Sequence, residues 1–226
     1  ELRGVSDTGN AIRIGALTTY TQLIHAPLLR EHAPALIAAS RTIGAIQIQN
    51  RGTIGGNIVN ASPAGDSLPV LAAFDATLEI GSAHGVRMLP FTQFYPGYRR
   101  TALEPDELLL AIHLPERKTG ERCFYHKVGT RRAQAISKVV MGMRVGMNDG
   151  VISHIGIGVG SVAPTVVRAH ETEKLLCGAA LTADVIAQAR QRIAGEVTPI
   201  TDLRSTEHYR RTVTGNVLAH LLGQLV

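Results

Sequence analysis

The sequence predicts an α+β fold in two parts, residues 1–115 and 120–226. Segments with strand-like alternation are joined by hairpin turns, whereas a parallel sheet would need long helical crossovers. Helix-like segments follow one another at the end of the chain, and strands followed by helices are typical of the α+β class. Between the two parts, residues 116–121 contain no apolar side chain, which predicts a linker.

In the first part, alternation or short apolar runs predict strands over 11–16, 77–80, 86–89 and 107–114. Ser82-Ala83-His84-Gly85 separates the second strand from the third, so we expect these two to form a hairpin. Helices are expected over 20–29, 34–40 and 66–73. Thr18 and Thr19 are placed to cap the first helix, and the third reads as a short buried helix despite Pro69.

In the second part, strands are expected over 123–128, 139–147, 151–159 and 165–168. Asp149-Gly150 supplies the positive φ values of a tight hairpin turn between two of them. Helices are expected over 169–177, 183–194 and 205–222. Ser205 is placed to cap the last helix, whose apolar face would carry Tyr209, Val213, Val217 and Leu221. We therefore expect a three- to four-stranded antiparallel sheet packed on helices.

The composition indicates a folded chain with a substantial core. Of 226 residues, 45% are hydrophobic and 18% are charged, which excludes intrinsic disorder. No apolar run approaches the ~20 residues of a membrane-spanning helix. Two cysteines, Cys123 and Cys177, exclude a disulfide scaffold and a CxxC site, and unpaired cysteines favour a cytoplasmic protein. The histidines show no ligand spacing, so we expect no metal site.

The charge balance does not predict a nucleic-acid partner. A net charge of +5 could attract a polyanion, but the chain has no Trp and few other aromatic residues for base stacking. A bound phosphate group explains the basic excess equally well. The glycines of Gly156-Ile157-Gly158-Val159-Gly160 lack the third glycine and the helix of a dinucleotide-binding fingerprint, so we interpret them as a glycine-lined strand. P-loop, HExxH and GxSxG motifs are absent.

The segment from Gln47 to Ala73 carries the most specific pattern. Gly55-Gly56 removes two Cβ atoms, so the backbone could turn tightly and direct successive N–H groups at an anion. Short hydrogen-bonding side chains surround this pair: Thr53, Asn57 and Ser62. Asp66 would repel a phosphate, but its carboxylate suits ribose hydroxyls. An ordinary glycine-rich turn before a buried helix is the alternative interpretation.

Arg51-Gly-Thr-Ile-Gly-Gly-Asn57, continued by Asn60-Ala-Ser-Pro-Ala-Gly-Asp66, closely resembles the FAD-binding segment of the molybdenum hydroxylases, the family of xanthine dehydrogenase and carbon monoxide dehydrogenase. Asp106–Pro115 resembles the last strand of the family's flavin domain, and Lys127–Lys138 resembles the loop beside the flavin. The chain is identified as similar to the FAD-binding (medium) subunit. The resemblance implies the second half of a PCMH-type FAD-binding domain over 1–115 and a carbon monoxide dehydrogenase flavoprotein-type C-terminal domain over 120–226.

The resemblance also implies which residues contact FAD. Five consecutive residues match the loop that wraps the pyrophosphate: Thr53, Ile54, Gly55, Gly56 and Asn57. Asp66 matches an acidic residue near the adenosine end, and Leu109 matches an apolar residue on the adenine side. Ile43 falls where the family places an apolar residue at the cofactor, and Lys127 matches a basic contact. Ser62 completes the expected set.

Whole subunits of the family begin with a further half-domain that carries a second glycine-rich loop of the Ala-Gly-Gly-Thr-Asp type. No segment of this chain matches that loop. The resemblance therefore implies an N-terminally truncated subunit without the first FAD loop. We expect such a chain to bind FAD weakly and to associate through exposed apolar surface.

The resemblance implies an electron-transfer subunit of a xanthine- or purine-oxidising enzyme, with no catalytic residue of its own. A molybdopterin-binding large subunit would oxidise the substrate, and [2Fe–2S] clusters on a small subunit would feed FAD, which would reduce NAD or another acceptor. The loop Lys127–Lys138, with Arg131 and Gln134, is hypothesised to control access of the acceptor. Three alternatives remain: the flavin subunit of a carbon monoxide, aldehyde or N-heterocycle dehydrogenase; a self-sufficient oxidase; and an interaction module that has lost FAD.

Overall fold

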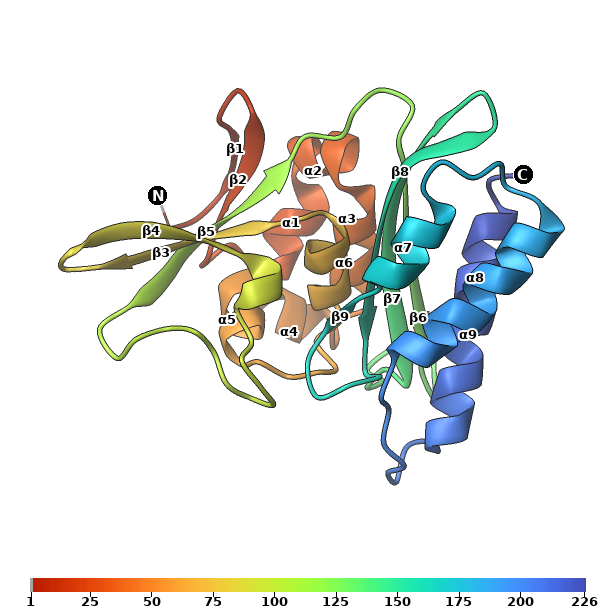
Figure 1. The fold of residues 1–226 in the computed structure, drawn as a ribbon. Helices are drawn as coiled ribbons and strands as arrows, with labels where there is room; N and C mark the ends of the chain where they lie inside the picture. The colour runs from red at the N-terminus through yellow and green to blue at the C-terminus, as the bar shows by residue number, and fades with distance from the viewer. Residues whose placement is uncertain (1) are drawn as a thin grey trace.

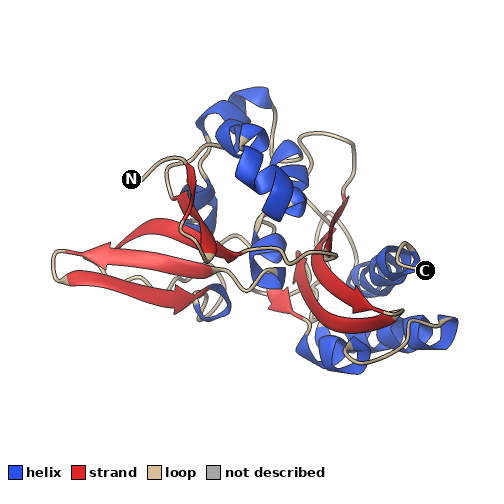
Figure 2. Cartoon of the chain, turned by 90° about the horizontal axis from the view of Figure 1, so that it is seen from above, coloured by secondary structure: helices blue, strands red, loops and turns tan. Residues whose placement is uncertain are grey.

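The computed structural model describes residues 2–226; Glu1, where the expected first part begins, lies outside the described residues. The chain forms four layers, visible from left to right in Figure 1: a sheet, a group of short helices, a second sheet, and a second group of helices. Seen from above, the short helices lie between the two sheets (Figure 2). The predicted α+β class is confirmed.

The first sheet has five antiparallel strands in the order β1-β2-β5-β3-β4. Their bounds are Val5–Asp7 (β1), Ala11–Gly15 (β2), Thr77–Ser82 (β3), Gly85–Pro90 (β4) and Leu108–Pro115 (β5). β3 and β4 form the predicted hairpin, with Thr77 opposite Pro90 and Ser82 opposite Gly85. Strand β1 was not predicted, because three residues carry too little alternation to be recognised.

Six helices cover one face of this sheet: Tyr20–His25 (α1), Pro27–His32 (α2), Pro34–Arg41 (α3), Ile46–Arg51 (α4), Ile54–Val59 (α5) and Leu68–Ala73 (α6). A short 3₁₀ turn, Phe91–Gln93 (η1), follows β4. The single helix expected over 20–29 is wrong: it is two helices, because Ala26 precedes Pro27 and adopts an extended conformation. Thr19 caps α1 as expected, through its bond with the N–H of Gln22.

The second sheet has four antiparallel strands in sequence order: Arg122–Val128 (β6), Val139–Asn148 (β7), Val151–Gly160 (β8) and Val167–Arg168 (β9). Three helices cover its outer face: His170–Leu176 (α7), Ala183–Glu196 (α8) and Glu207–Gly223 (α9). The predicted cap of α9 is off by one residue, since the Thr206 side chain accepts the bond from the N–H of Tyr209. The predicted apolar face is confirmed at Val217 and Leu221, which are buried in the core of the second half, and Val213 packs against that core. The prediction is wrong at Tyr209, which is 41% exposed.

Gly142 on β7 and Gly156 and Gly158 on β8 face helix α6, and the prediction of a glycine-lined strand is confirmed. A Cβ at Gly142 would lie 2.7 Å from the Cα of Val70, and one at Gly158 would lie 2.8 Å from the carbonyl carbon of Pro69. Every residue of α6 is buried, as expected for 66–73. The missing side chains therefore let the α6 backbone rest directly on the second sheet, which joins the two halves of the chain.

The predicted linker has no regular structure, but it is held in place. Arg144 on β7 pairs with Glu121 at 2.6 Å and donates to the carbonyl oxygens of Pro115 and Glu116. Both side chains of the pair are less than 10% exposed. No helix formed by residues 2–226 is long and apolar enough to span a bilayer.

Candidate functional site

The glycine motif folds as the first turn of helix α5. Thr53 is the N-cap, and its Oγ1 accepts a bond of 3.1 Å from the N–H of Gly56. The N–H of Ile54 donates to the carbonyl of Thr18 and that of Gly55 to the carbonyl of Ala16. The expected concavity of free N–H groups is therefore wrong, because these donors already have partners within the chain. That residues Thr53 to Asn57 contact FAD remains a prediction.

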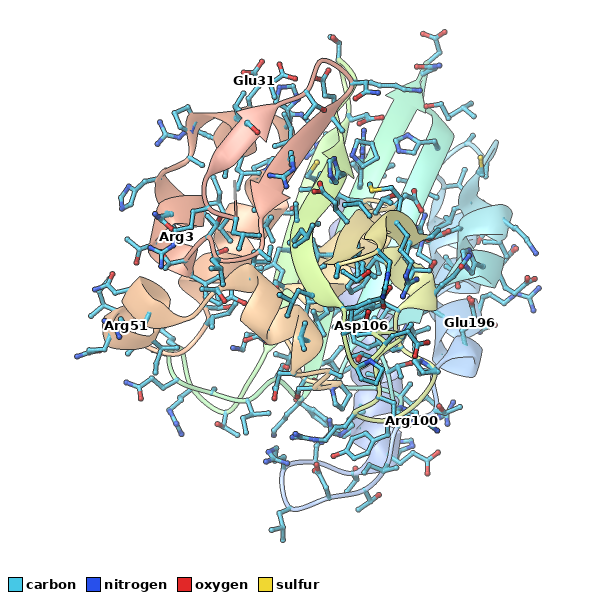
Figure 3. The ribbon with its side chains drawn as sticks, turned by 90° about the vertical axis from the view of Figure 1, so that its left-hand side faces the viewer. Arg3, Glu31, Arg51, Arg100, Asp106 and Glu196 are labelled. Carbon is cyan, nitrogen blue, oxygen red and sulfur yellow. The ribbon has the colours of Figure 1, made fainter. Side chains whose placement is uncertain are left out.

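The two glycines of the motif have different surroundings. A Cβ at Gly55 would lie 2.7 Å from both the Cβ and the carbonyl oxygen of Ala16, so Gly55 permits α5 to pack on the turn after β2. Gly56 is exposed, and a Cβ there would approach only the Thr53 hydroxyl. Bare backbone thus faces outward at Gly56, where a ligand could approach closely. Arg51, at the end of α4, is exposed and lies at the edge of the molecule in Figure 3.

Asn57 connects this motif to a buried carboxylate. Its Oδ1 accepts a bond of 2.8 Å from the hydroxyl of Ser67, the residue next to Asp66. Asp66 is 9% exposed, and its Oδ2 accepts a bond of 2.6 Å from the Nζ of Lys127 on β6. Its Oδ1 is buried and has no hydrogen-bond partner within residues 2–226. Burial raises the pKa of Asp66, although Lys127 and the nearby hydroxyl of Ser137 oppose this shift.

Lys127 also brings the end of α3 into the site. Its Nζ donates to the carbonyl oxygen of Thr42 at 3.1 Å, one residue before Ile43. Ile43 is half-buried and packs against the first core. Lys127 thus connects Asp66 with the backbone next to Ile43, although these three predicted residues come from three separate segments and from both halves of the chain.

The remaining two predicted residues, Leu109 and Ser62, form no hydrogen bond with this group in the described part of the chain. Leu109 is 9% exposed in the first core, where it pairs with Ile80 on β3. Ser62 accepts a bond from the N–H of Ala64 and lines a cleft on the side of the second sheet. The hydrogen bonds of the described residues do not link either one to Asp66.

The cleft at Ser62 has a volume of about 670 Å³ and lies between segments of both halves. Its walls include the loop residues Ile136 and Ser137 and three arginines: Arg99, Arg204 and Arg210. Arg210 is 4% exposed and donates to the carbonyls of Lys138 and Ser161 and to Asp202 at 2.7 Å. Sequence analysis missed Arg210, because its position on a helix face does not reveal that it lines a cleft.

Asp202, at the rim of the cleft, is held ionised by its neighbours. Burial opposes its charge, but the N–H groups of Arg204 and Ser205 and the guanidinium of Arg210 together lower its pKa to about 2. The cleft therefore keeps one fixed negative charge among three positive ones.

A second groove, of about 510 Å³, is lined by the first residues of the 129–137 loop and by the end of β6. Thr42, Lys127 and the basic residues Arg131 and Arg132 line it. Arg131 donates from Nε to the carbonyl oxygen of Ala133 at 3.0 Å and from Nη2 to that of Gln134. Gln134 has a φ of +50°, a left-handed conformation that side chains rarely adopt. The loop is therefore a tight turn braced by its own arginine.

The arrangement fits a large polar ligand such as FAD. The unpaired Oδ1 of Asp66 needs a donor, which a ribose or ribityl hydroxyl could supply. The exposed backbone at Gly56 leaves room for a phosphate group of such a molecule, and the apolar side chain of Ile43 suits one of its rings. The described part of the chain contains no group of three or more side chains able to hold a metal ion.

Two family models match the chain. Residues 1–117 match the FAD binding domain in molybdopterin dehydrogenase, and residues 124–225 match the CO dehydrogenase flavoprotein C-terminal domain. Among curated proteins, the putative xanthine dehydrogenase FAD-binding subunit XdhB of Escherichia coli (strain K12) is 33% identical over 97% of this chain and 77% of its own length. The carbon monoxide dehydrogenase medium chain of Hydrogenophaga pseudoflava is 30% identical over 98% of this chain and 77% of its own length.

Solved structures agree with these matches. A chain of carbon monoxide dehydrogenase from Hydrogenophaga pseudoflava superposes with a TM-score of 0.94 at 30% identity, over 97% of this chain and 76% of that one. A chain of quinoline 2-oxidoreductase from Pseudomonas putida 86 superposes with a TM-score of 0.90 at 21% identity, over 98% of this chain and 76% of that one, which is a likeness of fold alone.

Proposed function

Because the chain belongs to the FAD-binding medium subunits of the molybdenum hydroxylases, we propose that it passes electrons from [2Fe–2S] clusters on a small subunit through FAD to NAD or another acceptor. A molybdopterin-binding large subunit would oxidise the substrate. FAD supplies the step from one-electron carriers to a two-electron acceptor, and the chain's own residues bind and orient it. The proposal assigns 1–115 to the second half of a PCMH-type FAD-binding domain and 120–226 to the C-terminal domain, in a cytoplasmic enzyme.

Xanthine or another purine is the substrate class that we favour for the large subunit. The Ala61-Ser-Pro-Ala-Gly-Asp66 segment, similar to purine-oxidising members, supports this choice. The alternatives are carbon monoxide, aldehydes and N-heterocycles, since a carbon monoxide dehydrogenase subunit has almost the same identity to this chain as the xanthine dehydrogenase subunit.

The buried, half-satisfied carboxylate of Asp66 is the observation that carries the proposal. A carboxylate oxygen that is out of water and without a donor costs free energy that a bound hydroxyl would recover. Lys127 fixes the other oxygen, so the unpaired one is held in place. We assign to FAD the residues Ile43, Thr53, Ile54, Gly55, Gly56, Asn57, Ser62, Asp66, Leu109 and Lys127.

The 670 Å³ cleft is the site that we propose for the electron acceptor. Three arginines in its walls favour an anionic molecule such as a nicotinamide dinucleotide. Ile136 and Ser137 belong to the loop beside the flavin, so a molecule in this cleft would lie next to that loop. The hydrogen bond from Arg131 to Ala133 would hold this loop in one conformation and so control access to the cleft.

FAD binding by the purified chain tests the proposal. FAD fluorescence and absorbance would be measured on titration of wild type, Asp66→Asn, and the control Asp149→Asn, which makes the same change in the exposed β7–β8 turn. We expect wild type and Asp149→Asn to bind alike and Asp66→Asn to bind about tenfold more weakly, a difference of ~1.4 kcal/mol. Absence of binding by wild type would favour an interaction module that has lost FAD, an alternative supported by the occupied N–H groups of Ile54 and Gly55.

A further inference from the structure

The end of helix α3 leaves three carbonyl oxygens without helical partners, at Arg41, Thr42 and Ile43. Terminal carbonyls need donors from elsewhere, and capping side chains or water usually supply them. Here the chain reverses at Gly44, whose φ of +55° is open to glycine, and α4 follows directly. The reversal carries α4 back beside the end of α3, where its side chains can reach these carbonyls.

Gln49 on α4 satisfies two of the three carbonyls. Its Nε2 donates to the oxygen of Arg41 at 3.2 Å and to that of Ile43 at 3.1 Å. The residue is 9% exposed, whereas its neighbour on the same helix, Gln47, is exposed. A buried amide with both N–H groups committed to backbone oxygens holds those oxygens in one place, since leaving them unpaired costs free energy.

Strand β6 binds both the carbonyl oxygen and the side-chain hydroxyl of Thr42. Lys127 donates to the oxygen of Thr42 at 3.1 Å. The Thr42 hydroxyl donates to the carbonyl of Ala39 at 2.9 Å, so the Tyr125 hydroxyl must be the donor in its 2.8 Å bond with Thr42. Burial raises the pKa of Tyr125, which keeps this donor protonated. Residues 41–43 are therefore fixed from two sides, by α4 and by β6.

We propose that Gln49 is a positioning residue, which sets the place of Ile43 against FAD by holding the carbonyls on either side of Thr42. This inference rests on the proposed function, in which Ile43 contacts the cofactor. This role requires no contact between Gln49 and FAD. Its amide acts through the backbone carbonyls of Arg41 and Ile43, while the hydrogen bonds from β6 hold Thr42 in place between them.

The matched pair Gln49→Glu and Gln47→Glu tests the proposal in the full chain. Both variants exchange an amide for a carboxylate on the same helix, but only Gln49→Glu replaces the donor with an oxygen that repels two carbonyls. FAD affinity and the visible absorption spectrum of bound FAD would be measured for both, together with Ile43→Ala and the double variant. We expect Gln49→Glu to weaken FAD binding about tenfold and to alter the spectrum, and Gln47→Glu to match wild type.

The double variant separates positioning from a general loss of stability. If Gln49 acts through Ile43, the effects of Gln49→Glu and Ile43→Ala on affinity will be less than additive. Additive effects, or wild-type affinity and spectrum in Gln49→Glu, would overturn the inference and leave the proposed function intact. Wild-type behaviour of Ile43→Ala would overturn the role of Ile43 and the inference with it. The rate of backbone hydrogen exchange over 36–50 should rise in Gln49→Glu and not in Gln47→Glu. Equal protection in these two variants would show that the bonds of Gln49 to Arg41 and Ile43 do not fix this segment.

Discussion

Replacing Gly158 with alanine should push the two halves of the chain apart. A Cβ at this position would lie 2.8 Å from the carbonyl carbon of Pro69 and still closer to its oxygen. These atoms belong to the backbone of α6, a helix whose residues are all buried. No side-chain rotation can relieve the contact, so α6 or β8 must move.

The magnitude follows from the cost of overpacking, which is ~1–3 kcal/mol for an extra methyl group in a packed core. Because the opposing atoms are backbone, we expect the upper end, about 3 kcal/mol. For a chain of this length each kcal/mol corresponds to about 2–4 °C in Tm, so the expected loss is about 6–12 °C. Thermal and urea unfolding followed by circular dichroism measures both quantities.

Gly195→Ala is the control for this substitution. Gly195 lies within α8, and a Cβ built there would meet no atom within 4 Å beyond its chain neighbours and the helix's own backbone. Alanine is the better helix former, so we expect no loss and a gain of about 0.5 kcal/mol. If Gly158→Ala unfolds at the wild-type temperature, close contact between α6 and β8 does not constrain the protein, and the reasoning fails.

Two further predictions concern charged residues. Arg144→Met should reduce the free energy of unfolding by ~3 kcal/mol in urea titrations, because the buried Glu121 carboxylate loses its guanidinium partner and keeps only the N–H of Lys118 and the ring of His154; an unchanged midpoint would show that the linker needs no anchor. The Arg13 guanidinium lowers the pKa of Glu79 to about 2, so this pair stabilises the fold above the unfolded pKa near 4.5 and is lost as pH falls toward 2. Between pH 4.5 and 2, the free energy of unfolding should fall more steeply with decreasing pH in wild type than in Glu79→Gln. Parallel curves of this free energy against pH would contradict the prediction.

Local sequence patterns predicted the elements that depend on local chemistry. The β3–β4 hairpin, the glycine-lined strand β8 and the buried helix α6 each follow from alternation, turn residues or apolar runs within a few positions. The prediction of α1 failed at a local feature as well, since Pro27 sets the conformation of Ala26.

Features decided by distant contacts were not predictable in this way. Helix α5 begins in a stretch with two glycines, which are poor helix formers, and packing of Gly55 on Ala16 outweighs that preference. Gln49 and Arg210 carry no sequence signal that distinguishes them from exposed neighbours. Their roles appear only when the end of α3 and the end of β8 are brought beside them.

The glycine-lined face and the candidate FAD site depend on one another through α6. Asp66 lies two residues before α6 on the first half of the chain, and its partner Lys127 lies on β6 of the second half. Their 2.6 Å bond requires a fixed distance between α6 and the second sheet. The glycines that face α6 set this distance, because a Cβ on any of them would push the helix away from the sheet. A substitution such as Gly158→Ala should therefore weaken FAD binding without touching a cofactor contact. The unpaired oxygen of Asp66 is held in place by the packing of the two halves as well as by the residues around it.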